Sequence, residues 1–184
     1  METFKSLLLI NSHQIGVCMS KMTAEDFADT IRAAKSSLGR TLCRDYDGAI
    51  QRALVVETWA HQGYGKHTTN RDGINYGAGR VYIMSFRGHN ALNIATGKEG
   101  EPSCVWIREV YPTEGLTSKE ARSPFTLTKA MHIDRTLDGL PIGGEGLWLE
   151  GEAVQESRIL DLTAAKKAEG ELPTNCIGVY RLNL

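Results

Sequence analysis

One glutamate inside an otherwise apolar stretch is the residue of this sequence best suited to chemistry. Glu57 belongs to "ALVVETW", and the apolar run predicts a β-strand over residues 53–58. Side chains alternate between faces along a strand, so Glu57 shares its face with Val55 and Trp59. A tryptophan is rarely left on a bare solvent face, which indicates a partly desolvated carboxylate that needs a cationic partner, supplied by a bound ligand. The alternative, in which Glu57 faces solvent on an antiparallel strand, stays open.

A second stretch contains a Gly97-Lys98 pair that invites comparison with a phosphate-binding loop. Such a loop reads G-x-x-x-x-G-K-[ST], but Glu99 follows Lys98 and no glycine stands five residues before Gly97. The apolar residues within 91–95 have helical spacing, and Gly97 is typical of the residue that ends a helix. The stretch therefore predicts a short helix and disfavours phosphate binding.

Composition and charge narrow the class of protein. The chain has 184 residues, which predicts one domain, and its formal net charge is -1, which gives no reason to expect nucleic-acid or acidic-membrane binding. The N-terminus is read as neither a signal peptide nor a membrane span. Four scattered cysteines predict free thiols in a reducing cytoplasm. His61 and His67 have no third ligand nearby, so we expect no metal site.

The elements that must position these residues follow a recognisable order over residues 1–110. Strands and helices are predicted at 7–18 (strand), 23–38 (helix), 53–58 (strand), 80–86 (strand), 88–97 (helix) and 103–110 (strand). This β-α-β-β-α-β order predicts an α+β, ferredoxin-like antiparallel sheet with both helices on one face. The bare face of such a sheet predicts a homotrimer.

The remaining segments are an insertion and an extension. Residues 61–79 form a polar, glycine-rich loop of the length that is usually functional or mobile. Residues 111–184 form a C-terminal extension of the same domain, with a strand at 147–150, a short helix at 164–169 and a final strand from 176.

Two stretches resemble a known family. They are "TIRAAKSSLGRTLCRDYDGAIQRA" (30–53) and "RVYIMSFRGHNALNIA" (80–95), followed by the strand "SCVWI". Their matching points resemble the phage-encoded S-adenosylmethionine lyases, formerly called hydrolases. These points are Thr30, Arg32, Ala33, Ala34, Gly39, Asp45, Gly48, Ala53, Val81, Ile83, Ala91, Leu92, Asn93 and Ala95. The resemblance covers about half of the chain and implies a ferredoxin-like trimer with ligand sites between subunits.

The resemblance also implies an activity. In that family the substrate's own carboxylate displaces methylthioadenosine and leaves homoserine lactone, without metal or cofactor, and the phage evades host restriction-modification in the host cytoplasm. Ile50 stands where the family has a tyrosine, and Gly77 and Ala78 stand near its glutamate, so Glu57 is the nearest substitute as the catalytic carboxylate. The implied substrate-binding residues are Ser12, His13, Tyr46, Asp47, Trp59 and Tyr64.

Two further hypotheses stay beside the lyase. One is an inactive trimer of the same fold that binds a nucleotide or a ligand like S-adenosylmethionine. The other is an anti-defence protein that docks on a host protein through the 61–79 loop.

Overall fold

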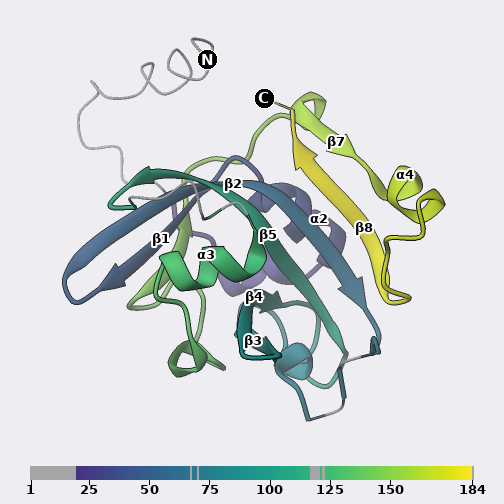
Figure 1. The fold of residues 1–184 in the computed structure, drawn as a ribbon, viewed down its shortest axis with the longest axis horizontal. Coiled ribbons are helices and arrows are strands. Elements are labelled where there is room, and N and C mark those ends of the chain that lie inside the picture. Colours follow the sequence, from purple (N-terminus) through teal and green to yellow (C-terminus); the bar gives the residue numbers. More distant parts are fainter. Residues whose placement is uncertain (1–19, 67, 70, 117–120, 122, 184) are drawn as a thin grey trace.

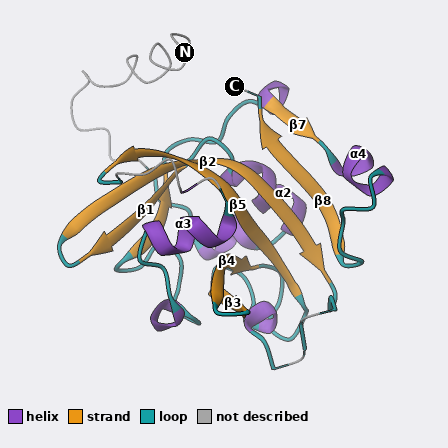
Figure 2. Cartoon of the chain, viewed as in Figure 1, coloured by secondary structure: helices purple, strands orange, loops and turns teal. Residues whose placement is uncertain are grey.

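The computed structural model describes residues 20–66, 68–69, 71–116, 121 and 123–183. Eight strands form one curled antiparallel sheet, and the helices between them are few and short (Figure 2). The strands are β1 (Thr41–Tyr46), β2 (Ala49–Gln62), β3 (Val81–Phe86), β4 (His89–Ala95), β5 (Ser103–Glu114), β6 (Leu147–Glu150), β7 (Ile159–Asp161) and β8 (Cys176–Leu182). The predicted ferredoxin-like fold is therefore wrong.

Strand β2 organises the sheet. It is the longest strand and pairs with β5 along most of its length, with β1 along its first half and with β8 along its second half. The full order is β3-β4-β5-β2-β1-β6, with β8 beside β2 and β7 beside β8. Figure 1 shows the result, with the β1–β2 hairpin projecting on one side and β7 and β8 forming the other flank.

Two tight turns fix the hairpins of this sheet. Asp47 and Gly48 have φ values of 52° and 78° between β1 and β2, and Arg87 and Gly88 have φ values of 50° and 80° between β3 and β4. Two consecutive residues with positive φ give the two-residue turn whose twist matches that of the flanking strands. The turn at Asp47 and Gly48 therefore joins β1 and β2 into a hairpin.

Short helices and 3₁₀ turns pack against the sheet. They are α2 (Thr30–Ser37), α3 (Pro124–Ala130) and α4 (Thr163–Ala168), together with four 3₁₀ turns, η2 (Ala24–Phe27), η3 (Gly73–Asn75), η5 (Arg135–Leu137) and η6 (Glu156–Arg158). The Thr58 hydroxyl on β2 donates to the Ala34 carbonyl of α2, and this side of the sheet holds the main apolar core.

The predicted helix over 23–38 forms in two pieces. The Asp26 carboxylate accepts from the Thr23 backbone N–H (2.7 Å) and so caps the first piece, η2. The chain then breaks, because Asp29 has an extended backbone and its side chain caps α2 by accepting from the Arg32 N–H (2.7 Å). The segment therefore buries Phe27 of η2 and Ala33 and Ala34 of α2, but it does not form one helix.

The predicted helix at 88–97 is wrong, because this segment is strand β4. Residues 91–95 are all buried, since the sheet is covered on both faces here. A strand that is buried on both faces does not show the apolar–polar alternation by which strands are recognised. The spacing of the apolar residues within 91–95 therefore resembled that of a helical face. The argument for a trimer rested on the same β-α-β-β-α-β order and does not survive it.

Several predictions for the second half are confirmed. The strand at 147–150 is β6, the short helix is α4 and the final strand is β8. The predicted strand at 7–18 lies outside the described residues. In the part of the chain that is described, no helix is long and apolar enough to cross a membrane.

Candidate functional site on the central sheet

The face of β2 turned away from α2 carries a row of buried functional side chains. Glu57, Trp59 and His61 follow one another at every second position, so they point to the same side, and all three are buried. The intervening Thr58 and Ala60 face the core. The prediction that Glu57 and Trp59 share a face is confirmed, and the alternative of a solvent-facing carboxylate is not. Val55, predicted on the same face, lies instead in the apolar core, because the pairing of β2 with β5 shifts between Val55 and Glu57.

Strand β5 adds two more residues through an irregular pairing. Trp59 pairs with Trp106, and Glu57 pairs with Glu109. Between these two pairs, β2 has one residue but β5 has two, so the two strands are out of step. Arg108 is thereby the extra residue, with register shifts on both sides of Glu57. A bulge of this kind redirects a side chain, and bulges are common beside active sites.

The redirected Arg108 lies against both indoles. Its guanidinium carbon is 4.4 Å from the Trp59 ring centroid and 4.3 Å from the Trp106 ring centroid. Burial lowers the pKa of Arg108, although the Glu57 carboxylate, 3.9 Å from its Nε, opposes the change. The cation is held by aromatic faces more than by direct hydrogen bonds.

Two carboxylates and a second arginine border this cluster. Arg181 of β8 donates to Glu57 (2.5 Å) and to Glu109 (2.8 Å), and the other oxygen of Glu57 accepts from the Trp59 indole N–H (2.9 Å). The cationic partner expected for Glu57 is therefore part of the protein, and no ligand is required to supply it.

The row continues onto the neighbouring strands. Tyr82 of β3 pairs with Asn93 of β4, which pairs with Trp106, which pairs with Trp59, so the four side chains cross four strands on one face. Tyr82 and Asn93 are almost fully buried. Ile74 of η3 packs against Tyr82 at this end of the row.

The polar atoms of this face are unusual because several have no partner. Among the described residues, five buried side-chain polar atoms make no hydrogen bond, and four of them lie here: His61 Nε2, Tyr82 OH, Trp106 Nε1 and Arg108 Nε. An unsatisfied buried polar group costs about 1–3 kcal/mol, so four together indicate a place built for a ligand or for water. Aromatic faces with nearby donors and acceptors suit a flat heteroaromatic ligand.

His61 is neutral in this setting. Burial lowers its pKa to about 4, and the charge of Arg108 acts in the same direction. A neutral imidazole has one donor and one acceptor nitrogen, so His61 can accept as well as donate a hydrogen bond to a ligand. Its ring lies 6.0 Å from that of Trp106.

Only part of the predicted site comes together. Glu57 and Trp59 meet in this cluster. Tyr46 ends β1 and Asp47 lies in the turn before β2, so both are roughly 30 Å away along the chain. Tyr64 is exposed and donates to Asn75 (2.9 Å) in the following loop. The other two predicted binding residues, Ser12 and His13, lie outside the described residues.

Five residues of this face were not among those predicted from the sequence as site residues: His61, Tyr82, Trp106, Arg108 and Arg181. His61 could have been found by extending the alternation of Glu57 and Trp59 by two residues. The rest depend on strand pairing and on the bulge, which no local pattern showed.

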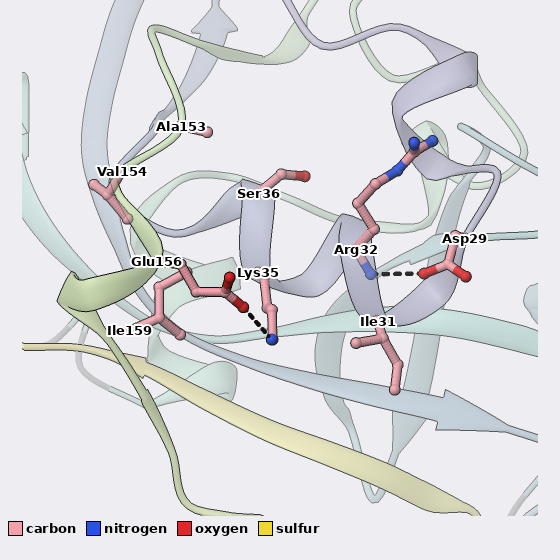
Figure 3. Close-up of a pocket in the computed structure, with 9 residues that line it drawn as sticks. All are labelled: Asp29, Ile31, Arg32, Lys35, Ser36, Ala153, Val154, Glu156 and Ile159. Carbon is pink, nitrogen blue, oxygen red and sulfur yellow. Dashed lines mark hydrogen bonds and ion pairs between the residues drawn. The ribbon is translucent and has the colours of Figure 1, made fainter.

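Two surface grooves lie elsewhere. The larger, about 380 Å³, runs between α2 and residues 153–159. There Lys35 pairs with Glu156 (2.7 Å), and the Asp29 carboxylate caps α2 by accepting from the Arg32 backbone N–H (Figure 3). The smaller, about 280 Å³, includes Tyr46, which stacks on His132 at 4.1 Å. Neither groove contains any of the unpartnered polar atoms.

Comparison with known proteins identifies the family. A sequence model of the methylpurine-DNA glycosylase family matches residues 25–164. Three relatives share the name "Putative 3-methyladenine DNA glycosylase". The one from Bacillus licheniformis is 33% identical over 140 residues, covering 65% of this chain and 71% of the relative. The one from Anaeromyxobacter sp. is 34% identical over 151 residues, covering 76% and 77%. The one from Clostridioides difficile is 29% identical over 173 residues, covering 74% and 86%.

The chain therefore belongs to the methylpurine-DNA glycosylase family. This overturns the resemblance to S-adenosylmethionine lyases, and with it the lyase activity, the phage anti-restriction role and S-adenosylmethionine as the small-molecule partner. The two alternatives built on that resemblance fall as well. The exclusion of nucleic acid was also wrong, because net charge is a sum over the whole surface and does not describe one binding face.

Proposed function

We propose that this protein is a DNA glycosylase that removes alkylated purines from DNA. The observation that carries the proposal is this face of the sheet, where the row from Tyr82 to Trp59 lies beside His61 and Arg108 and four buried polar atoms make no hydrogen bond among the described residues, in a chain of this family. Glycosylases turn the target nucleotide out of the duplex and read the base by stacking and by hydrogen bonds to its edge. The row supplies both kinds of contact.

The reaction is a substitution at the C1′ carbon of deoxyribose. An alkylated purine carries a positive charge, so it takes the bonding electron pair and leaves as a neutral base when the C1′–N9 bond breaks. Water adds its oxygen to C1′ and loses a proton, leaving an abasic site. Positive charge develops on the sugar in the transition state, as in other glycosidic cleavages.

Several side chains of this face have a part in this scheme. The indoles of Trp59 and Trp106 provide apolar surface for the base, and neutral His61 provides an acceptor or a donor for its edge. Burial raises the pKa of Tyr82, so its hydroxyl stays protonated and can donate. The Glu57 carboxylate, expected to be catalytic, has both oxygens bonded to protein donors, and we assign it to holding Trp59 in place.

A specific observation favours a second candidate, a protein that binds alkylated purines in DNA without releasing them. Among the described residues of this face, the two carboxylates Glu57 and Glu109 are both paired with Arg181. Neither is a free base that could take the proton from water.

Incubation with methylated duplex DNA separates the two candidates. We expect free methylpurines in the supernatant and alkali-labile abasic sites in the DNA, with neither product from unmethylated DNA of the same sequence. Binding to methylated DNA without release would support the second candidate. The absence of both binding and release would contradict both.

Replacement of Tyr82 by phenylalanine tests the site itself. The hydroxyl makes no hydrogen bond to any described residue, so Tyr82→Phe should leave the melting temperature unchanged or slightly higher. Release or binding should fall about tenfold, because one hydrogen bond to the ligand is lost. The matched control is Tyr76→Phe, whose hydroxyl donates to Asp138 (2.9 Å). This control should lose about 1 kcal/mol of stability and keep its activity. Full activity in Tyr82→Phe would remove Tyr82 from the site.

A further inference from the structure

The strand that carries Arg181 lies outside the part of the chain matched by the family. The match ends at residue 164, and β8 begins at Cys176. Within the fold, β8 is nevertheless a direct neighbour of the site, because it pairs with the second half of β2 and places Arg181 opposite Glu57. The chain therefore brings an element from outside the family match to the edge of the proposed base-binding row.

Arg181 resolves a conflict between two carboxylates. Glu57 and Glu109 are direct cross-strand partners on β2 and β5, and like charges at such positions destabilise the pairing. One Nη1 atom of Arg181 lies 2.5 Å from Glu57 and 2.8 Å from Glu109, so a single cation neutralises both. Burial alone would lower the pKa of Arg181, but the hydrogen bonds to Glu109 and Glu57 outweigh it and raise the pKa.

Glu57 connects Arg181 to the Trp59 indole of the site. The Glu57 oxygen that does not touch Arg181 accepts the Trp59 indole N–H at 2.9 Å. The Glu57 side chain is only 12% exposed, so it has little water with which to replace a lost partner. Arg181 therefore fixes one oxygen of the Glu57 carboxylate, and the other oxygen holds the Trp59 indole in place. This indole is part of the surface on which the base would stack.

We propose that Arg181 is a positioning residue of the base-binding site, which fixes the Glu57 carboxylate and through it the orientation of the Trp59 indole. This inference rests on the proposed function for its effect on DNA, but the link from Arg181 to Trp59 can be measured without DNA.

The three tryptophans of the chain make that measurement specific. In a ¹⁵N-labelled sample each indole N–H gives one signal. The Trp59 signal reports the bond to Glu57, and the Trp148 signal reports a similar bond to Glu150 (2.7 Å). The Trp106 N–H makes no hydrogen bond within the described part of the chain. A Trp59→Phe sample identifies the Trp59 signal by its loss.

The test variant is Arg181→Met, which keeps the length of the side chain and removes its charge. We expect the Trp59 signal to move toward the position of the unbonded Trp106 signal and to exchange faster with solvent, while the Trp148 signal stays in place. Arg181→Lys should restore the Trp59 signal in part. The control is Arg158→Met, because the Arg158 side chain holds the end of the same strand through the Asn183 carbonyl (3.1 Å) and does not touch the site. An unmoved Trp59 signal in a folded Arg181→Met protein, or the same shift in Arg158→Met, would overturn the proposal.

A second arm connects the indole to the reaction. With methylated duplex DNA, Arg181→Met should lose about tenfold to a hundredfold in kcat/KM, the scale of a misplaced group in a site, and Arg158→Met should keep wild-type values. If the wild type binds but does not release bases, the dissociation constant for methylated DNA replaces kcat/KM. If the wild type neither releases bases from methylated DNA nor binds it, the proposed function is refuted. The Trp59 indole signal then still shows whether Arg181 positions the indole. A moved signal with unchanged kinetics or affinity would show that the contact serves stability alone.

Discussion

Replacing Arg108 by methionine should reduce the release of methylated bases by a factor on the order of a hundred, or weaken binding to methylated DNA if no base is released. The guanidinium is desolvated over two indoles, and its Nε atom is aimed at no acceptor among the described residues. Because this N–H donor is already desolvated and fixed in place, the protein does not have to rearrange when a ligand binds to it. Methionine keeps the apolar stem against the rings and removes only the donor and the charge.

The folding stability of this variant should change little. The loss of two cation–π contacts, each worth about 0.5–2 kcal/mol, is offset by relief of the cost of burying the charge. We expect a melting temperature within a few degrees of wild type, measured beside the release assay. The matched control is Arg80→Met, since Arg80 donates to the Gly139 carbonyl at the surface (3.2 Å). Undiminished release, or a loss that parallels unfolding, would contradict a role for Arg108 in the site.

The second large effect is acid sensitivity caused by His61. Its pKa in the folded protein is about 4, below the ordinary value of 6.5. As the pH falls, His61 therefore binds a proton in the unfolded chain before it does so in the folded protein. The folding stability that the neutral His61 contributes above about pH 6.5 is lost between about pH 6.5 and pH 4. A difference of about 2.5 units corresponds to at most about 3 kcal/mol of unfolding free energy.

Urea unfolding at pH 7.5 and at pH 4 measures this loss. The wild type should lose about 3 kcal/mol more than His61→Gln over this interval, because carboxylates such as Asp134, whose pKa is lowered by hydrogen bonds from Thr136, titrate equally in both proteins. His89→Gln changes an exposed histidine and should behave like the wild type. Equal acid losses in wild type and His61→Gln would show that His61 is solvated in the folded protein.

The family assignment shows how a resemblance built on small residues misleads. Most of the matching points toward the lyases were alanines, glycines and turn residues such as Asp45 and Gly48. Such residues mark tight turns and close packing in any fold, and they carry no chemistry of their own. The site of this protein is instead made of large polar and aromatic side chains, and of these only Glu57 and Trp59 were selected from the sequence.

Local chemistry determined several elements of this protein. The Asp47-Gly48 turn, the capping interaction of Thr23 and Asp26, and the strands β6 and β8 follow from residues close together in the sequence. The alternation in "ALVVETW" also placed Glu57 and Trp59 on one face, because a period of two is a property of the strand itself.

The tertiary structure alone decided the rest. Residues 91–95 became strand β4 because β3 and β5 pair with it, and a segment buried on both faces carries no local sign of its period. Glu57 found its cation in Arg181, which is 124 residues further along the chain. Arg108 reached the indoles through a bulge that exists only where β2 and β5 meet. Contacts between strands distant in sequence depend on register and pairing, and these are set by the whole sheet.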